Sequence, residues 1–355
     1  MRTIGILGAS GQVGASVALY LKKFSGIETI CFIRSSYSTI FFDLYNIPFQ
    51  HIDFENEFLL KEKIGSLDVI LDFRYPAGQL HQILSESKKN ISRILSVMKK
   101  GSKYFYMSSI MAYGMPDNEK RIANYYLPRT SYSYIKRKIE RFVVSKGGQE
   151  DVQIYNFRLG QVHGFLQSVN ASFRKKLAEK NIALIDGAPG DLVNIIFVYP
   201  LCEAIIHCAN DKCKPGLYTL VASPQWSLQD LYEYYIQYYN RKAHLEFVQQ
   251  KSKNKRKSLL QHTIDFAKPY RSLVETYILM NFPSMSTRIK GSFRKNELIN
   301  SRNILIGKQE FIDFNLLGTP GISLIPGLTT EPLKIMQIEK EMEAFYNQVI
   351  ESKSR

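Results

Sequence analysis

The chain of 355 residues carries 47 lysines and arginines against 32 aspartates and glutamates, a formal net charge of +15. With 45% hydrophobic and 22% charged residues it has enough apolar material for a buried core, which excludes a disordered chain. It has neither the roughly 20 consecutive apolar residues of a membrane span nor a cleavable leader, so we expect a cytoplasmic protein.

The first 160 residues alternate short β-rich runs with longer helical ones, which is typical of a parallel sheet covered on both faces. Predicted strands cover residues 3–7, 28–33, 49–52, 68–72, 103–107 and 153–157. Predicted helices cover residues 13–22, 88–100, 132–144, 228–239 and 332–351. We therefore expect an α/β Rossmann fold, a doubly wound parallel sheet, in residues 1–165. A smaller C-terminal substrate-binding lobe in residues 166–355 should interleave with the last sheet strands.

A glycine-rich loop, GASGQVG at residues 8–14, directly follows the first predicted strand and opens the first predicted helix. Gly8 permits a tight turn, Gly11 lets the backbone approach a pyrophosphate, and Gly14 lets the helix pack closely on the strand. The unpaired amides of the helix N-terminus would face the phosphates. The alternative is a purely structural glycine turn. We predict a dinucleotide-binding loop formed by Gly8, Ser10, Gly11, Gln12, Val13 and Gly14.

The end of the second predicted strand bears on which dinucleotide is bound. It reads CFIRSS at residues 31–36, with Arg34 where NAD-binding proteins place a carboxylate on the ribose. A guanidinium matches the geometry of a 2′-phosphate, so the sequence favours NADP(H) over NAD(H), with an exposed structural arginine as the alternative. Asp53, at the end of the third predicted strand, is expected to accept a hydrogen bond from the adenine amino group or to form a turn.

Two overlapping Tyr-x-x-x-Lys pairs lie on the predicted helix 132–144: Tyr132 with Lys136, and Tyr134 with Lys138. Spacing of four places both side chains of a pair on one helix face. A neighbouring ammonium favours the phenolate, so the pKa of the tyrosine should fall from about 10 toward the range of an acid/base catalyst. The spacing alone does not choose between the pairs.

The four cysteines, Cys31, Cys202, Cys208 and Cys213, show no metal-ligand spacing, and each lies in or beside an apolar run. This distribution suits reduced thiols. The histidines are scattered without ligand spacing, so no metal is predicted, and His163 is expected to pack without taking part in the chemistry.

The chain resembles the extended short-chain dehydrogenase/reductase family, in particular its NAD(P)-dependent epimerase/dehydratase branch, which acts on nucleotide sugars. The resemblance follows the family order over roughly residues 1–240. The matching segments are GASGQVG at 8–14, DVILDF at 68–73, NISRIL from Asn90, YFYMSSIMAYG at 104–114, YSYIKRKIE at 132–140, NFRLGQVHG at 156–164 and GLYTLVASPQWSLQDL at 216–231.

The resemblance implies roles for particular side chains. The family carries a glutamate four residues after its catalytic lysine, here Glu140, which implies the pair Tyr132 and Lys136. Its catalytic serine or threonine lies four residues before the tyrosine of a Tyr-Gly pair, which implies Ser109. Tyr132 would exchange a proton with a sugar hydroxyl or ketone, Ser109 would hydrogen-bond the same oxygen, and Lys136 would hold the cofactor ribose. The nicotinamide would carry the hydride, and Asn90 would steady its helix beside the site.

Two departures from the family pattern bear on the reaction. The fourth strand of the family usually ends in a small neutral stretch, whereas this chain has DFRY at 72–75, so Arg74 is expected to contact the cofactor or a substrate phosphate. Sugar-nucleotide 4,6-dehydratases have an Asp-Glu pair where this chain has Ile110 and Met111. These two side chains cannot move protons, which argues against that dehydration.

Residues 241–310 hold 15 Lys/Arg against 5 Asp/Glu, so +10 of the net charge of +15 lies in this basic segment. One interpretation is peripheral contact with an anionic membrane surface at the inner face of the membrane. The other is a soluble lobe that closes over the substrate. Within the substrate lobe, Arg174 and Lys175 are candidates for contacts with the substrate.

These observations predict a reductase or epimerase of nucleoside-diphosphate sugars, using NADP(H), in polysaccharide or deoxysugar synthesis. We expect a homodimer and no nucleic-acid partner. The alternatives are a reductase of a non-nucleotide ketone or aldehyde, and an NADP-binding regulatory protein with a basic partner-binding lobe. The presence of Ser109, Tyr132 and Lys136 together speaks against the regulator, because sensing a cofactor requires no acid/base group.

Overall fold

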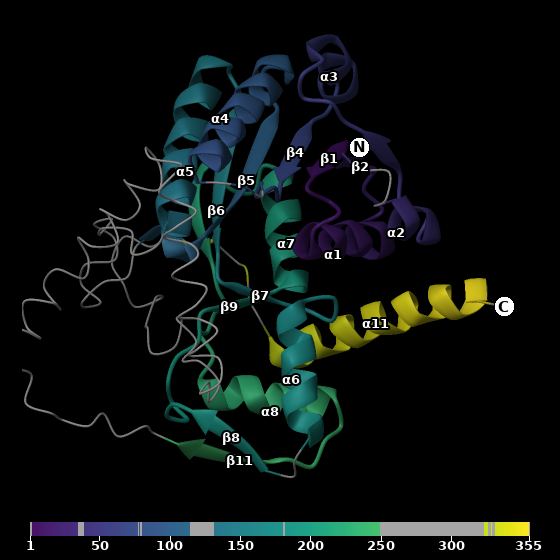
Figure 1. Ribbon diagram of the computed structural model, residues 1–355, viewed down its shortest axis with the longest axis vertical. Coiled ribbons are helices and arrows are strands. Elements are labelled where there is room, and N and C mark those ends of the chain that lie inside the picture. Colours follow the sequence, from purple (N-terminus) through teal and green to yellow (C-terminus); the bar gives the residue numbers. More distant parts are fainter. Residues whose placement is uncertain are drawn as a thin grey trace, which may run out of the picture.

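A seven-stranded parallel sheet forms the centre of the computed structural model (Figure 1). The structure describes residues 2–34, 39–76, 78, 80–113, 131–179, 182–248, 323–325, 328 and 331–354. The strand order is β10-β6-β5-β4-β1-β2-β3, so the order reverses between β1 and β4. The strands are β1 (Ile4–Leu7), β2 (Thr29–Ile33), β3 (Phe49–His51), β4 (Val69–Asp72), β5 (Lys103–Ser109), β6 (Gln153–Leu159) and β10 (Gly216–Leu220). This is the predicted doubly wound Rossmann fold, in which ligands bind where the strand order reverses.

Helices cover both faces of the sheet because its strands bury side chains on both sides. Ile4 and Ile6 of β1 belong to one apolar core and Leu7 to the other. The first core includes side chains of α1 (Gln12–Tyr20), which continues as the π-helical turn η1 (Leu21–Ser25), of α2 (Thr39–Leu44) and of α7 (Val198–Ala209). The second core includes side chains of α3 (Glu57–Ile64), α4 (Leu80–Val97) and α5 (Ser131–Gln149).

A smaller lobe lies beyond the carboxyl edge of the sheet (Figure 1). It contains α6 (Ser168–Glu179), α8 (Leu228–Tyr238) and two pairs of parallel strands, β7 (Gln161–His163) with β9 (Ile195–Phe197) and β8 (Ile182–Asp186) with β11 (His244–Val248). A capping box of Ser227 and Asp230 starts α8. The long helix α11 (Pro332–Ser354) contacts α7 and α8.

The described part of the chain contains no helix that is long and apolar enough to cross a bilayer. Most of the basic segment 241–310 lies outside the described residues, which include only 241–248 of it. The membrane interpretation of that segment therefore stays a prediction.

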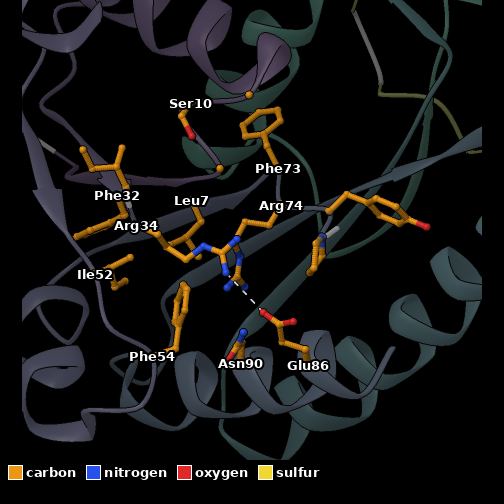
Figure 2. A pocket seen from close by; sticks show the side chains of 15 residues that line it. Leu7, Ser10, Phe32, Arg34, Ile52, Phe54, Phe73, Arg74, Glu86 and Asn90 are labelled. Carbon is orange, nitrogen blue, oxygen red and sulfur yellow. Dashed lines mark ion pairs between the residues drawn. The ribbon is translucent and has the colours of Figure 1, made fainter. Parts of the chain in front are cut away.

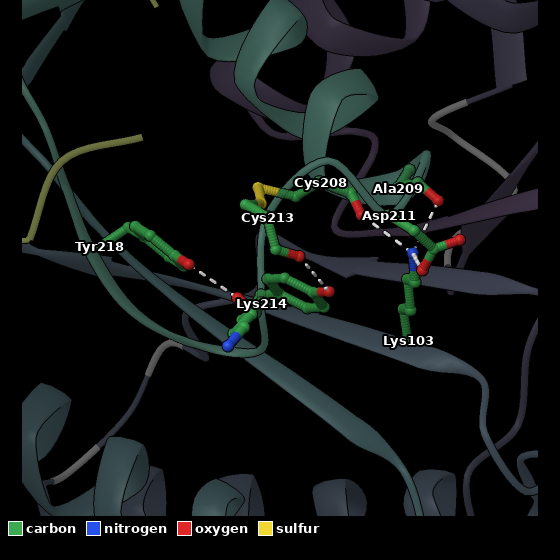
Figure 3. The surroundings of a disulfide bond; sticks show 8 residues. Lys103, Cys208, Ala209, Asp211, Cys213, Lys214 and Tyr218 are labelled. Atoms are coloured by element: carbon green, nitrogen blue, oxygen red, sulfur yellow. Dashed lines mark hydrogen bonds and ion pairs between the residues drawn. A yellow bond between two sulfur atoms is a disulfide. The ribbon is translucent and has the colours of Figure 1, made fainter. Parts of the chain in front are cut away.

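Two cysteines depart from the expectation of reduced thiols. A disulfide joins Cys208, near the end of α7, to Cys213 in the turn that follows (Figure 3), whereas Cys31 and Cys202 are free and buried. The chain reverses directly after the helix, which brings the two Cα atoms to 5.0 Å. Lys103, at the start of β5, holds this turn by donating to the carbonyl oxygens of Cys208 and Ala209 at 2.9 and 2.8 Å. Sequence spacing does not reveal such a reversal, so the pair was missed.

Candidate active site

The glycine-rich loop joins β1 to α1 at the point where the strand order reverses. Gly8 has a φ of +74°, and a Cβ at this position would lie 2.9 Å from the backbone nitrogen of Arg74. Gly11 is the N-cap of α1, and its N–H donates to the Gly8 carbonyl at 3.0 Å. A Cβ on Gly14 would overlap the same carbonyl oxygen. The loop therefore needs glycine for its turn and for the close packing of helix on strand.

A cavity of about 450 Å³, here called the inner cavity, opens beside this loop (Figure 2). The ends of β1, β2 and β4 form one wall, and Glu86 and Asn90 of α4 form the opposite wall. Of the six loop residues predicted to bind the dinucleotide, three line this cavity: Gly8, Ser10 and Gly11. The other three do not line it. Gln12 instead accepts a hydrogen bond from the Ser168 amide of α6 at 3.5 Å, while Val13 and Gly14 pack behind the loop.

Arg34 stands at the end of β2, as the sequence predicts, and its guanidinium crosses toward α4. Its Nη1 lies 3.5 Å from Oε1 of Glu86. A second, outer cavity of about 800 Å³ shares Arg34, Glu86 and Asn90 with the inner cavity and adds Asp53. Asp53 Oδ1 accepts a hydrogen bond from the Glu55 amide at 2.8 Å. Asp53 thus forms the turn that was one of its two expected roles, while it also lines the outer cavity.

Arg74 enters the inner cavity from the end of β4, and neighbouring side chains fix its guanidinium. Its Nε and Nη2 donate to the two carboxylate oxygens of Asp72 at 2.8 and 2.6 Å, and its guanidinium lies 4.5 Å from the centroid of the Phe54 ring. The Tyr104 hydroxyl donates to the same carboxylate. Burial opposes ionisation of Asp72, but the Arg74 charge and these hydrogen bonds keep its pKa below the ordinary range. A cation is therefore fixed directly beside the glycine loop.

The predicted catalytic side chains meet at the carboxyl end of β5. Tyr132, in the first turn of α5, lies close enough to Ser109, the last residue of β5, for the serine side chain to influence its pKa. Ser109 Oγ also accepts from the Met111 amide at 3.2 Å. Tyr134 packs against the second apolar core, and Lys138 is exposed. The structure thus brings Tyr132 to Ser109 and turns Tyr134 away.

Lys136 is buried beneath Tyr132 in a group of aromatic rings. Its Nζ donates to the Met107 carbonyl at 2.8 Å and lies 5.0, 5.4 and 5.8 Å from the ring centroids of Tyr106, Tyr75 and Tyr132. Burial lowers the pKa of Lys136 to about 8, although the nearby charges of Asp72 and Glu140 act in the opposite direction.

The expected fall in the pKa of Tyr132 is wrong for this structure. Burial raises its pKa above 10, and the Ser109 side chain offsets only part of that effect. Lys136 lies on the same helix face, as predicted, but its ammonium is directed at the Met107 carbonyl. Desolvation is therefore the dominant influence on the pKa of Tyr132.

A buried ion pair holds α5 in place behind these residues. Arg158 of β6 donates to both carboxylate oxygens of Glu140, at 2.9 and 2.6 Å, and its guanidinium lies 4.1 Å from the centroid of the Tyr113 ring. Arg137 Nε donates to the Ala112 carbonyl at 2.8 Å. Ala112 and Tyr113 belong to the 3-10 turn η3 (Ile110–Tyr113) directly after Ser109. The helix that carries Tyr132 and the turn that follows Ser109 are thereby fixed to each other.

Arg174 and Lys175 are not brought to this site. Both are exposed on α6 in the smaller lobe, and neither lines the inner or the outer cavity. His163 is buried in the same lobe with its Nδ1 2.6 Å from the Tyr235 hydroxyl, and burial lowers its pKa to about 3. It is therefore a neutral packing residue.

Glu86, Phe54 and Tyr75 also line the inner cavity, and none of them was predicted from the sequence. One signal was available for Glu86. It lies four residues before Asn90, so a predicted helix extended back past residue 86 would place both side chains on one face.

The glycine loop lies where the strand order of a doubly wound sheet reverses, beside a cavity and a Ser-Tyr-Lys group. This arrangement defines a Rossmann enzyme with a nucleotide cofactor. The sequence profile of the NAD dependent epimerase/dehydratase family matches residues 4–212. The chain belongs to this family. It is thus a short-chain dehydrogenase/reductase-type enzyme that uses a nicotinamide cofactor.

Several solved structures share this fold. UDP-glucuronic acid 4-epimerase from Bacillus cereus, in complex with UDP-glucuronic acid and NAD, is 15% identical with a TM-score of 0.52, covering 70% of this chain and 86% of that one. The Bordetella bronchiseptica enzyme WbmH, in complex with NAD+, is 18% identical with a TM-score of 0.52, covering 71% and 87%. dTDP-glucose 4,6-dehydratase from Bacillus anthracis, in complex with NAD, is 15% identical with a TM-score of 0.53, covering 70% and 85%. Comparison with curated protein sequences finds no significant match.

Proposed function

We propose that the protein is an NADP(H)-dependent reductase or epimerase that acts on a nucleoside-diphosphate sugar, with Tyr132 as its acid/base. The observation that carries this proposal is the approach of Tyr132 to Ser109, at the same sheet edge as the glycine-lined cavity. The complex of a similarly folded epimerase with UDP-glucuronic acid and NAD supports this substrate class.

In this proposal Tyr132 moves a proton at a substrate oxygen. Its hydroxyl would protonate a ketone oxygen during reduction, or remove a hydroxyl proton in the reverse direction, while Ser109 hydrogen-bonds that oxygen. Loss of the proton leaves a phenolate, and the charged Lys136, 5.8 Å from the Tyr132 ring centroid, stabilises that form. The bound nicotinamide supplies or accepts the hydride.

The residues beside Ser109 separate the proposed reactions from a dehydration. Ile110 is buried and Met111 is partly buried, and neither side chain has a proton to give or take. The second acid/base function that a sugar-nucleotide 4,6-dehydratase needs is therefore missing from these two positions. This difference supports a reductase or an epimerase, although a dehydratase shares the fold.

The surroundings of Arg34 support NADP(H) as the form of the cofactor. Its side chain is 66% exposed and lies where the inner and outer cavities adjoin, within reach of a group on the adenosine ribose. Gly8 and Gly11 leave room for the pyrophosphate, and Arg74 is a fixed cation beside them. Asp53 would lie near the adenine, and Lys136 would hold the nicotinamide ribose.

Turnover with a substrate panel tests the proposal. Purified protein is incubated with NADPH and a set of nucleoside-diphosphate 4-keto sugars, and the absorbance of NADPH is followed. A reductase consumes NADPH, whereas an epimerase interconverts sugar nucleotides, detected by chromatography, without net consumption. Turnover of simple ketones or aldehydes in the same panel, with none of any nucleotide sugar, would replace the proposed substrate class.

We also propose a homodimer that makes peripheral contact with anionic membrane through the basic segment 241–310. The net charge of +10 in that segment supports the contact, because each lysine or arginine near an anionic surface contributes about 1 kcal/mol. Co-sedimentation with phosphatidylserine vesicles at low and high salt tests it, and absence of binding at low salt contradicts it. Light scattering that gives twice the chain mass of 40.9 kDa would support the dimer, and the monomer mass would contradict it.

A further inference from the structure

Arg34 already has an anionic partner on the opposite side of the cavity. Its Nη1 lies 3.5 Å from Oε1 of Glu86, which projects from α4 toward the end of β2 (Figure 2). Both side chains line the inner cavity and the outer cavity. The ion pair therefore spans the region where the two cavities adjoin, between the glycine loop and the outer wall that includes Asp53.

Glu86 differs from Asp72, the carboxylate that holds Arg74. Asp72 is only 2% exposed, and Arg74 and Tyr104 hold its two oxygens. Glu86 is 41% exposed, and among the described residues that line the inner cavity it is the one carboxylate. Its charge faces the space that a ligand would fill.

We propose that Glu86 sets the cofactor specificity of the site by competing with the 2′-phosphate for Arg34. This inference rests on the proposed function, in which Arg34 binds that phosphate. The phosphate must displace Glu86 from the guanidinium, and the displaced carboxylate then remains in the same cavity as a like charge. The free 2′-hydroxyl of NADH meets neither obstacle, because it donates a hydrogen bond that the Glu86 carboxylate accepts.

The competition is limited in size because the pair is screened by solvent. Arg34 is 66% exposed and Glu86 is 41% exposed. Exposed ion pairs change an equilibrium by about fivefold at most, so with the added repulsion we expect Glu86 to weaken NADPH binding by about three- to tenfold. Glu86 thereby keeps NADH usable in a site whose arginine alone would select NADPH more strongly.

Glu86→Gln tests the competition, because it removes the charge and retains the size of the side chain. Binding of NADPH and of NADH is measured by isothermal titration calorimetry at low salt. We expect NADPH to bind about three- to tenfold more tightly than it binds the unaltered protein, and NADH to bind equally or more weakly. Raising the salt concentration should shrink the gain.

Glu55→Gln is the matched control. Glu55 lines only the outer cavity and pairs with Lys89 at 2.9 Å and Arg93 at 2.7 Å, so its loss removes one negative charge nearby and leaves Arg34 untouched. We expect the ratio of the two affinities to stay the same. An equal gain for NADPH in both variants would mean that general charge, and not competition for Arg34, is responsible, which would overturn the inference.

Arg34→Ala distinguishes failure of this inference from failure of the proposed function. If Arg34→Ala leaves the ratio of NADPH to NADH affinity unchanged, Arg34 does not bind the 2′-phosphate and the proposed cofactor preference fails. If Arg34→Ala lowers that ratio while Glu86→Gln leaves it unchanged, the preference stands and the competition is overturned. In the double variant, removing Glu86 should help NADPH less than it does when Arg34 is present.

Discussion

Arg34 and Arg74 are two guanidinium groups in one cavity, and their surroundings suit them to different tasks. Arg74 is 17% exposed, held by both oxygens of Asp72 and packed against Phe54, and its backbone touches the glycine loop. Its position is therefore fixed before any ligand arrives, beside the part of the cavity that suits a pyrophosphate common to both cofactors. Arg34 is 66% exposed and its ion pair with Glu86 is screened by solvent, so its side chain can respond to the group that distinguishes the two cofactors.

The first prediction concerns Arg34. Arg34→Ala should weaken NADPH binding by about ten- to hundredfold, because a charge-assisted hydrogen bond contributes roughly 1.5–3 kcal/mol. NADH binding should change little. Titration of both cofactors measures the effect, and Lys89→Ala, which removes a cation from the outer cavity alone, is the control. An equal loss for both cofactors would contradict a role in reading the 2′-phosphate.

The second prediction separates the two tyrosines of α5. They point about 200° apart on a helix, and Tyr132 alone reaches Ser109. Tyr132→Phe should reduce turnover by about a hundredfold or more, because general acid–base catalysis contributes about 10²–10⁴-fold, with cofactor affinity close to normal. Tyr134→Phe, its matched control, should retain most activity. The reverse order in steady-state kinetics would place the acid/base on the other tyrosine.

At the scale of elements, the site depends on how α5 is fastened to the sheet. The pair of Glu140 and Arg158 joins α5 to β6, and Arg137 joins α5 to η3. These contacts lie on the side of α5 that faces the sheet, below Tyr132 and Lys136. Because η3 begins directly after Ser109, the distance between Ser109 and Tyr132 is determined by this packing.

The third prediction concerns that ion pair. Glu140→Gln leaves Arg158, whose side chain is 0% exposed, without its carboxylate partner, and removing one member of a buried pair costs about 3–5 kcal/mol of unfolding free energy. Glu150→Gln, in the partly exposed pair with Lys146 at the C-terminal end of the same helix, should cost no more than about 1 kcal/mol. Urea denaturation measures both. Equal losses would show that the buried pair contributes no more than a surface pair.

The elements of the sheet were predictable because buried parallel strands leave a strong pattern. The run ICFI at 30–33 is apolar on both faces, as a central strand requires, and the strand does occupy Thr29–Ile33. Helix boundaries were weaker. The sequence predicts a helix from residue 88, whereas α4 begins at Leu80, because serine, histidine and glutamine in its first two turns obscure the apolar face.

The candidate site was predictable only where a motif fixes local geometry. The spacing of Tyr132 and Lys136 placed both on one helix face, and the segment 8–14 leads from β1 into the first turn of α1 as expected. Contacts between distant segments were not accessible in this way. The approach of Glu86 to Arg34 depends on how α4 packs beside β2, and the pKa of Tyr132 depends on burial that sequence spacing does not show.

At the scale of the whole molecule, α11 connects the smaller lobe to the Rossmann domain (Figure 1). Glu339 accepts a hydrogen bond from the Phe165 amide at 2.9 Å, in the segment after β7. Further along the helix, the Tyr346 carbonyl accepts from the Tyr45 hydroxyl at 2.9 Å, next to α2. The C-terminal helix therefore packs against segments that are far apart in the sequence, and its attachment contributes to the relative position of the two lobes.

Glu339 makes this attachment sensitive to pH. Burial raises the pKa of Glu339 from its ordinary value of 4.5 to about 8; the Phe165 amide opposes this rise, and the nearby Glu343 adds to it. The folded chain therefore holds a proton that the unfolded chain releases above about pH 4.5. The stabilising contribution of Glu339 is complete below that pH and is lost as the pH rises toward 8.

The fourth prediction follows from the direction of this pH dependence. The unfolding free energy of the protein should fall relative to that of Glu339→Gln as the pH rises from about 5 to about 8, by at most about 1.4 kcal/mol per pH unit. Glutamine retains an oxygen for the Phe165 amide and does not titrate, so the variant should lack this dependence. Urea denaturation followed by circular dichroism at several pH values measures the difference. Glu341→Gln, at an exposed position of α11, is the control, and its stability should vary with pH as that of the unaltered protein does. If the stability of Glu339→Gln also varies with pH in the same way as that of the unaltered protein, Glu339 does not titrate in this range.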